Sequence, residues 1–97
     1  MLCLGALMKV RWLRKALHNL EVVHEYVARE NPEAALKLVI KIRSAVKQLE
    51  TFPEMGRVGR VKETREIVVN PYFIIYRVNG SFVDILRILH SARKFPD

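Results

Sequence analysis

The sequence predicts an α+β domain in which a helical hairpin packs on one face of a small, mostly antiparallel β-sheet. Two observations lead to this fold class. Residues 16–49 contain two consecutive apolar stripes at helical spacing, and residues 65–90 contain three stretches rich in β-branched and aromatic residues. An Asn-Gly pair at 79–80 separates the last two stretches, as in a β-hairpin. The predicted order of elements is β-α-α-β-β-β.

The chain begins with an apolar segment, residues 1–7, that precedes the predicted first strand at 10–13 (VRWL). This segment is too short to span a membrane and lacks the basic start of a secretory signal. Met8-Lys9-Val10 resembles a second start of the chain. We therefore expect residues 8–97 to form a single domain and residues 1–7 to be a dispensable N-terminal extension.

Two helices are predicted to follow the first strand. The first carries a stripe made of Ala16, Leu17, Leu20, Val23 and Val27. At 31–33 the sequence Asn-Pro-Glu ends this helix and begins the next, because proline suits a first helical turn and Asn31 suits the N-cap. A short turn between helices of similar length gives an antiparallel hairpin. The second stripe consists of Ala35, Leu38, Val39, Ile42, Ala45, Val46 and Leu49.

Residues 53–64 (PEMGRVGRVKET) interrupt both kinds of periodicity and are predicted to form an exposed basic loop. Strands are then expected at 65–70, 72–79 and 81–90, with turns at Asn70-Pro71 and Asn79-Gly80.

The last of these strands carries a charge on each face if its side chains alternate strictly. Alternation places Arg87 with Ile85 and Leu89, and Asp84 on the opposite face. Such a strand requires either a β-bulge or a partner that covers its outer side. The sequence leaves this choice open.

The composition favours an acidic or polyanionic partner, because 17 lysines and arginines against 10 acidic residues give a net charge of +7. The single cysteine, Cys3, excludes an internal disulfide and fits a reducing cytoplasm. His18 and His24 lie six residues apart on the first helix and so on different faces. No metal site, cofactor or membrane association is predicted.

Four stretches in the second half resemble the RelE/ParE toxin superfamily of bacterial type II toxin–antitoxin modules. They are FPEMGRVGR (52–60), TREIVV (64–69), PYFIIYRV (71–78) and ILRILHSARKFP (85–96). With the helical hairpin before them, the resemblance covers residues 8–97 and is closest to the ParE-like branch. It implies the fold derived above and one of two activities. ParE-like members inhibit DNA gyrase, and RelE-like members cut mRNA on the ribosome.

The residues that RelE-like enzymes use are largely missing from this chain. The family pattern has lysines on the second strand and an arginine on the third, where this chain has Glu66, Val68 and Phe73. The pattern also has a tyrosine near the C-terminus, and no tyrosine follows His90. The resemblance therefore favours the ParE-like branch, in which inhibition occurs by binding and no catalytic residue is required. The alternative is a reduced nuclease site in which His90 acts as base or acid beside Arg65 and Arg93.

Contact with the target is expected from cations in the basic loop and in the C-terminal tail, because nothing in the predicted core needs them and loops often carry function. The target is DNA gyrase or, on the alternative, the ribosome with its mRNA. The predicted target-binding residues are Arg57, Arg60, Lys62, Arg93 and Lys94.

Neutralisation is expected from a cognate antitoxin that folds on binding. A cationic toxin with an apolar groove suits an acidic, amphipathic and initially disordered partner. The residues expected to bind it could equally fill the core of the toxin. They are Leu20, Val23, Val27, Val39 and Tyr72.

Overall fold

The computed structural model describes residues 8–91 of the 97-residue chain. The predicted α+β class is confirmed, with one additional short strand inside the segment that was expected to be a loop. The elements in chain order are β1 (Lys9–Trp12), α1 (Arg14–Ala28), α2 (Pro32–Gln48), β2 (Arg57–Val58), β3 (Arg65–Val69), β4 (Tyr72–Asn79) and β5 (Phe82–His90).

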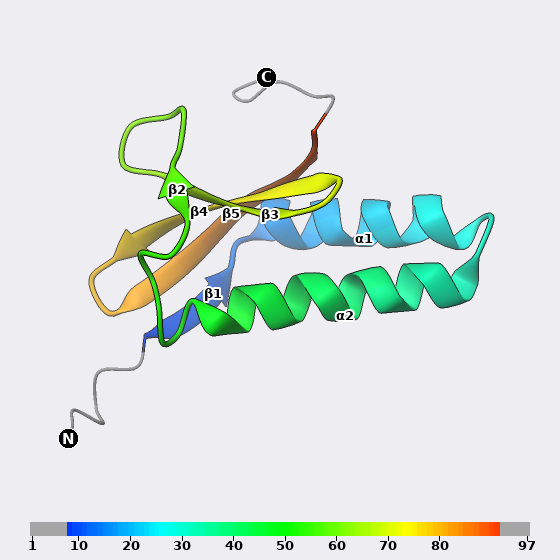
Figure 1. Ribbon diagram of the computed structural model, residues 1–97, viewed down its shortest axis with the longest axis horizontal. Helices are drawn as coiled ribbons and strands as arrows, with labels where there is room; N and C mark the ends of the chain where they lie inside the picture. The colour runs from blue at the N-terminus through cyan, green and yellow to red at the C-terminus, as the bar shows by residue number, and fades with distance from the viewer. Residues whose placement is uncertain (1–7, 92–97) are drawn as a thin grey trace.

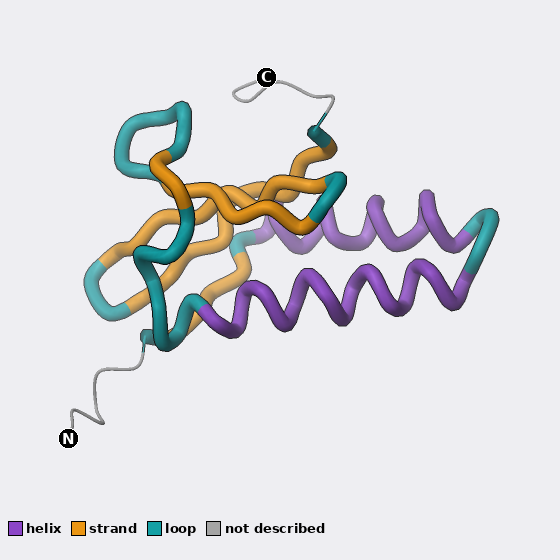
Figure 2. The backbone as a smooth tube through the Cα atoms, in the orientation of Figure 1, coloured by secondary structure: helices purple, strands orange, loops and turns teal. Residues whose placement is uncertain are grey.

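The sheet has the strand order β1-β5-β4-β3-β2. Strand β1 runs parallel to β5, and all other neighbours are antiparallel. Figure 1 shows α1 and α2 side by side as an antiparallel pair beneath one face of the sheet. Figure 2 shows that a tight turn joins the two helices, whereas the connection from α2 to β3 is long and carries β2. Among the elements of residues 8–91, no helix lies over the other face of the sheet.

The junction between the helices has the predicted N-cap. The Oδ1 atom of Asn31 accepts a 3.1 Å hydrogen bond from the Ala34 N–H, and Pro32 occupies the first helical turn. Most residues of both apolar stripes face the sheet, where they meet the branched and aromatic residues of β3, β4 and β5, but Leu17 is 47% exposed. The fully buried members of this core include Ala16, Ile42, Leu49, Ile74, Tyr76, Val83 and Ile85.

The hairpin between β4 and β5 forms where it was predicted, but its turn residues are shifted by one position. Asn79 still pairs with Phe82, so the two-residue loop is Gly80-Ser81. Gly80 has a φ of +63°, a conformation that glycine adopts without steric cost. A glycine at the first loop position is one of the two common solutions for such a tight hairpin.

A β-bulge at Leu86 determines which faces of β5 carry its charged residues. The register passes from the pair Tyr76–Ile85 directly to the pair Ile75–Arg87, so Leu86 has no partner on β4. Ile85 and Ile88 both face the helices. The register places Arg87 on the side of Asp84, but the Nε atom of Arg87 still reaches Asn19 of α1 at 3.2 Å. Of the two options that the sequence left open, the structure therefore shows the β-bulge, in which one extra residue reverses the side of every residue after it.

Candidate functional site

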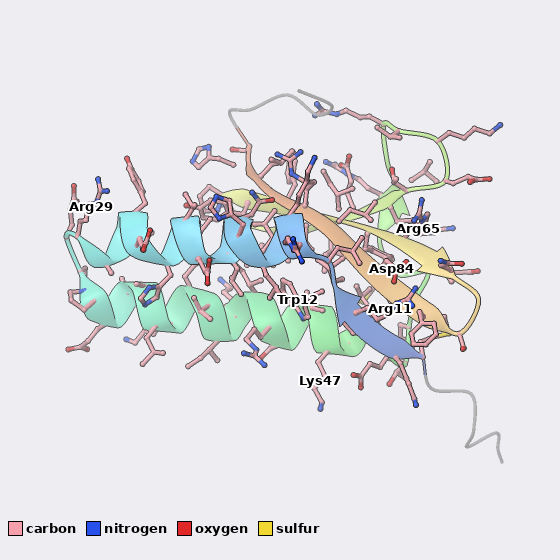
Figure 3. All side chains as sticks on the ribbon, turned by 180° about the vertical axis from the view of Figure 1, so that it is seen from behind. Arg11, Trp12, Arg29, Lys47, Arg65 and Asp84 are labelled. Carbon is pink, nitrogen blue, oxygen red and sulfur yellow. The ribbon has the colours of Figure 1, made fainter. Side chains whose placement is uncertain are left out.

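By strand register, the face of the sheet without helices carries two buried carboxylates, Glu66 on β3 and Asp84 on β5. Asp84 accepts hydrogen bonds from the Nε and Nη2 atoms of Arg11, at 2.7 and 3.2 Å. Figure 3 shows these two side chains pointing toward one another. Arg77 on β4 approaches the same carboxylate at 4.0 Å, so it forms a cross-strand ion pair. The hydrogen bonds from Arg11 hold the pKa of Asp84 below its ordinary value, and the carboxylate is ionised at neutral pH.

Glu66 is held by Arg57, its cross-strand partner on β2. The Nε and Nη2 atoms of Arg57 lie 3.3 Å from Glu66 Oε1, and its guanidinium carbon lies 5.1 Å from the centre of the Phe73 ring. The expectation that Arg57 has no part in the fold was therefore wrong. Sequence reasoning missed this pair because it placed Arg57 in a loop, where no strand register assigns a partner. The guanidinium of Arg57 is thus engaged in an ion pair within the fold, while 58% of its side chain remains exposed and accessible to a partner.

Arg65 also binds the fold. Its Nη1 atom donates to the carbonyl oxygens of Gly56, at 2.8 Å, and Glu54, at 3.3 Å. These bonds hold the chain segment that leads into β2. Four arginines of the described residues are thus engaged within the fold. Arg11 and Arg77 are paired with Asp84, Arg57 is paired with Glu66, and Arg65 binds backbone carbonyls.

Two predicted target-binding residues, Arg60 and Lys62, are exposed in the loop that joins β2 to β3. In Figure 1 this loop extends away from the sheet on the side opposite to the helices. Arg93 and Lys94, the other cations of the prediction, lie outside the described residues.

His90 lies at the end of β5, and its ring meets that of Tyr72 edge-on with 5.4 Å between centres. Its position relative to Arg65 follows from the register. His90 pairs with Tyr72, whereas Arg65 pairs with Tyr76, four residues further along β4. Four residues of strand correspond to about 13 Å. The structure therefore does not bring together these two residues of the predicted nuclease site.

One groove, of about 440 Å³, lies between α1 and the end of β5, and we name it the α1–β5 groove. Val23 and Tyr72 of the predicted antitoxin-binding set line it, and burial raises the pKa of the Tyr72 hydroxyl. At its wall, Asn19 Oδ1 accepts hydrogen bonds from the Ile88 N–H, at 3.0 Å, and from Arg87 Nε, at 3.2 Å. The asparagine thus satisfies a backbone donor of β5 beyond the end of its partner strand β1.

A second groove, of about 630 Å³, lies between α2 and β1, and we name it the α2–β1 groove. Leu36 and Ile40 line it and are 57% and 54% exposed, so that two large apolar side chains lie together at the surface of this groove. Val39 of the predicted antitoxin-binding set lies here too. The charged side chains at the groove are Arg43, Lys47 and Glu50, and Figure 3 shows Lys47 extending outward from α2.

The predicted antitoxin-binding residues thus do not form one surface. Val23 and Tyr72 belong to the α1–β5 groove and Val39 to the α2–β1 groove, while Leu20 is partly buried against the core. Val27 is half-buried on α1. Sequence reasoning missed Leu36 and Ile40, although a signal for them exists. They stand four residues apart on α2, outside the stripe that faces the sheet, and so form a second apolar flank.

Residues 8–91 contain no group of three or more His, Cys, Asp or Glu side chains that could hold a metal ion. None of the helices in this part of the chain is long and apolar enough to cross a membrane.

Comparison with known proteins gives consistent matches. A family model described as the ParE toxin of the type II toxin–antitoxin system parDE matches residues 10–95. The chain is 38% identical over 90 residues to the Y4kP protein of Sinorhizobium fredii, which covers 91% of this chain and 93% of that one. It is 34% identical over 85 residues to toxin RelE2 of Caulobacter vibrioides, covering 88% and 97%. The solved chromosomal ParDE TA system from P. aeruginosa aligns with a TM-score of 0.78 at 33% identity, over 89% of this chain and 98% of that chain.

Proposed function

The chain belongs to the ParE toxin family of type II toxin–antitoxin systems, and we propose that it inhibits DNA gyrase, and thereby replication, by binding and not by catalysis. One observation carries the choice of mechanism. On the face of the sheet without helices, Arg11 and Arg57 are paired with the buried carboxylates Asp84 and Glu66. In addition, His90 lies about 13 Å along the strands from Arg65.

RNA cleavage requires a base, an acid and cations that stabilise the charge developing on the phosphate. A phosphate placed on this face of the sheet would meet Glu66 and Asp84 as well as their arginines, and the carboxylates would oppose its binding. Inhibition by binding requires only an exposed surface that is complementary to the target. The loop with Arg60 and Lys62 supplies such a surface, and Arg93 and Lys94 stay part of the proposal.

The test is a gyrase supercoiling assay with the purified toxin, run beside a reconstituted translation reaction with intact mRNA. We expect inhibited supercoiling and accumulation of cleaved DNA, with translation unchanged. The double variant Arg60→Ala/Lys62→Ala should lose most of the inhibition. The matched control is Lys37→Ala/Lys41→Ala, which removes the same charge from exposed positions on α2 and should inhibit like the wild type. Unchanged supercoiling with the wild-type toxin would refute the proposal.

The RelE-like mRNA endonuclease is the second candidate, because a relative that is 34% identical carries the name RelE2 and because His90 is exposed at the end of β5. On this alternative the translation reaction would show cut mRNA. His90→Ala would then abolish cutting without weakening antitoxin binding.

The proposed partner is a cognate antitoxin with an acidic, amphipathic segment that folds as it binds. The solved ParDE relative is a toxin–antitoxin system, which supports this class of partner. The α2–β1 groove offers exposed Leu36 and Ile40 to the apolar side of such a segment, and Arg43 and Lys47 to its acidic side. The outer edge of β1, at the end of the sheet, adjoins this groove and has backbone groups able to pair with an added strand.

A further inference from the structure

The segment from Pro53 to Gly56, which leads into β2, is held by two side chains of the neighbouring strands. Tyr76 donates its hydroxyl proton to the Pro53 carbonyl at 2.7 Å and accepts from the Gly56 N–H at 3.0 Å. Arg65 donates to the carbonyls of Glu54 and Gly56. Arg65 and Tyr76 are cross-strand partners on β3 and β4. Four backbone polar groups of one short segment are therefore satisfied by a single cross-strand pair.

The fit at Gly56 is tight. A Cβ at this position would lie 2.6 Å from the Tyr76 hydroxyl oxygen and 2.8 Å from the Glu66 carbonyl oxygen. No residue larger than glycine fits there unless both Tyr76 and the backbone of β3 at Glu66 move. Tyr76 is fully buried, and burial raises the pKa of its hydroxyl, which therefore keeps the proton that it donates to Pro53.

The loop that follows is compact in its own right. The Gly59 N–H donates to the Thr64 carbonyl at 2.8 Å, and Thr64 Oγ1 donates to the Val61 carbonyl at 2.6 Å. Glu63 adopts a φ of +66°, which costs a residue with a Cβ about 1 kcal/mol or more. Arg60 and Lys62 thus project from a loop with a defined shape.

Apart from the bonds at 53–56 and the contacts of the Arg57 side chain with Glu66 and Phe73, the loop is attached to the domain through the short strand β2. Strand β2 has two residues, and it forms only the pairs Arg57–Glu66 and Val58–Arg65 with β3. Two residue pairs at the edge of a sheet stabilise the position of a strand only weakly. The direction in which the loop leaves the sheet depends on the bonds at the segment 53–56.

From this arrangement we infer that Arg65 and Tyr76 are positioning residues for target binding: they form a clamp that fixes the β2–β3 hairpin so that Arg60 and Lys62 meet the target already oriented. The inference rests on the proposed function, in which these two cations contact the target. Preorganisation raises affinity because the loop does not have to be ordered during binding. The clamp assigns Arg65 a role other than the nuclease role considered from the sequence.

The variant Tyr76→Phe tests the clamp, because it removes one hydroxyl and keeps the buried ring. We expect the Gly56 amide to exchange with solvent faster and trypsin to cut faster after Arg57, Arg60 and Lys62. Gyrase inhibition should fall about five- to tenfold, with antitoxin affinity within about twofold of wild type.

The control is Val83→Ala, which shortens a fully buried side chain of β5 that takes no part in the hydrogen bonds of the segment 53–56. It lowers global stability without removing a bond of the clamp. If Gly56 exchange and tryptic cleavage rise no more in Tyr76→Phe than in Val83→Ala, the clamp does not exist. If they rise but Tyr76→Phe inhibits like the wild type, the clamp does not position the target contact.

Failure of the proposed function gives a different result. In that case the wild-type toxin does not inhibit gyrase at all. The clamp is then tested by measuring growth arrest in cells, because growth arrest does not depend on the identity of the target. Weaker arrest by Tyr76→Phe than by Val83→Ala supports the clamp, and equal arrest overturns it.

Discussion

Replacing Arg57 by alanine, alone and together with Glu66→Gln, separates its role in the fold from the target contact that the sequence predicts for it. In the structure its guanidinium is the ion-pair partner of Glu66, whose side chain is 5% exposed. Alanine at position 57 would leave that carboxylate buried without its cation, and burial of an unpaired charge is destabilising. The variant should therefore unfold more readily than the wild type, whatever Arg57 does for binding.

The magnitude follows from the two exposed fractions. Breaking a fully buried ion pair costs about 3–5 kcal/mol, and an exposed pair contributes about 0–1 kcal/mol. Here one partner is buried and the other is 58% exposed, and the N–O distances of 3.3 Å are long for a charged hydrogen bond. We expect Arg57→Ala to lower the free energy of unfolding by about 1–2 kcal/mol. For a domain of this size that corresponds to a fall in Tm of about 5–15 °C.

A double-mutant cycle measures the pair. Thermal and urea unfolding, followed by circular dichroism, would compare the wild type with Arg57→Ala, Glu66→Gln and the double variant. The double variant should be more stable than Arg57→Ala alone, because the neutral amide no longer needs a cation. An Arg57→Ala variant as stable as the wild type, or a double variant no more stable than Arg57→Ala, would refute the reasoning. The double variant, with its smaller stability defect, also tests whether Arg57 contributes to the proposed inhibition of gyrase.

Three further predictions concern other parts of the chain. Asn31→Ala removes the N-cap acceptor of α2 and should lower the free energy of unfolding by about 1 kcal/mol in urea denaturation. Because the folded pKa of Asp84 is lowered from 3.8 by its hydrogen bond with Arg11, the stability it contributes is present above that value and lost as pH falls through the folded pKa. Asp84→Asn should therefore be less stable than wild type at pH 7, with a gap that narrows in acid titrations below about pH 4. Ile40→Asp should weaken antitoxin binding more than tenfold in calorimetry, while Lys41→Ala beside it should change binding less than twofold.

The sequence predicted the features of the fold that depend on local chemistry. The helical stripes, the Asn31 cap and the hairpin after β4 each arise from residues within a few positions of one another, and all three are present in the structure. Strand β2 was missed because two residues carry no periodicity, and an edge strand of that length is defined by its neighbour β3. Likewise, the position of the bulge at Leu86 depends on the register of β4 against β5, which no local pattern specifies.

The candidate site was harder to predict than the fold because the partners of its arginines are also set by strand register and not by local sequence. A basic residue in a glycine-containing segment looks like a solvent-exposed cation, and for Arg60 that interpretation agrees with the structure. Arg57 lies three residues earlier in the same segment but pairs with a buried carboxylate nine residues away. Arg65 binds the backbone eleven residues before it. Charge alone cannot separate these cases, because a guanidinium has five donors and can satisfy the fold and a partner at once. The distinction rests on strand register, and hence the variants that test function in this family need partners chosen from the structure, as Glu66→Gln is for Arg57→Ala.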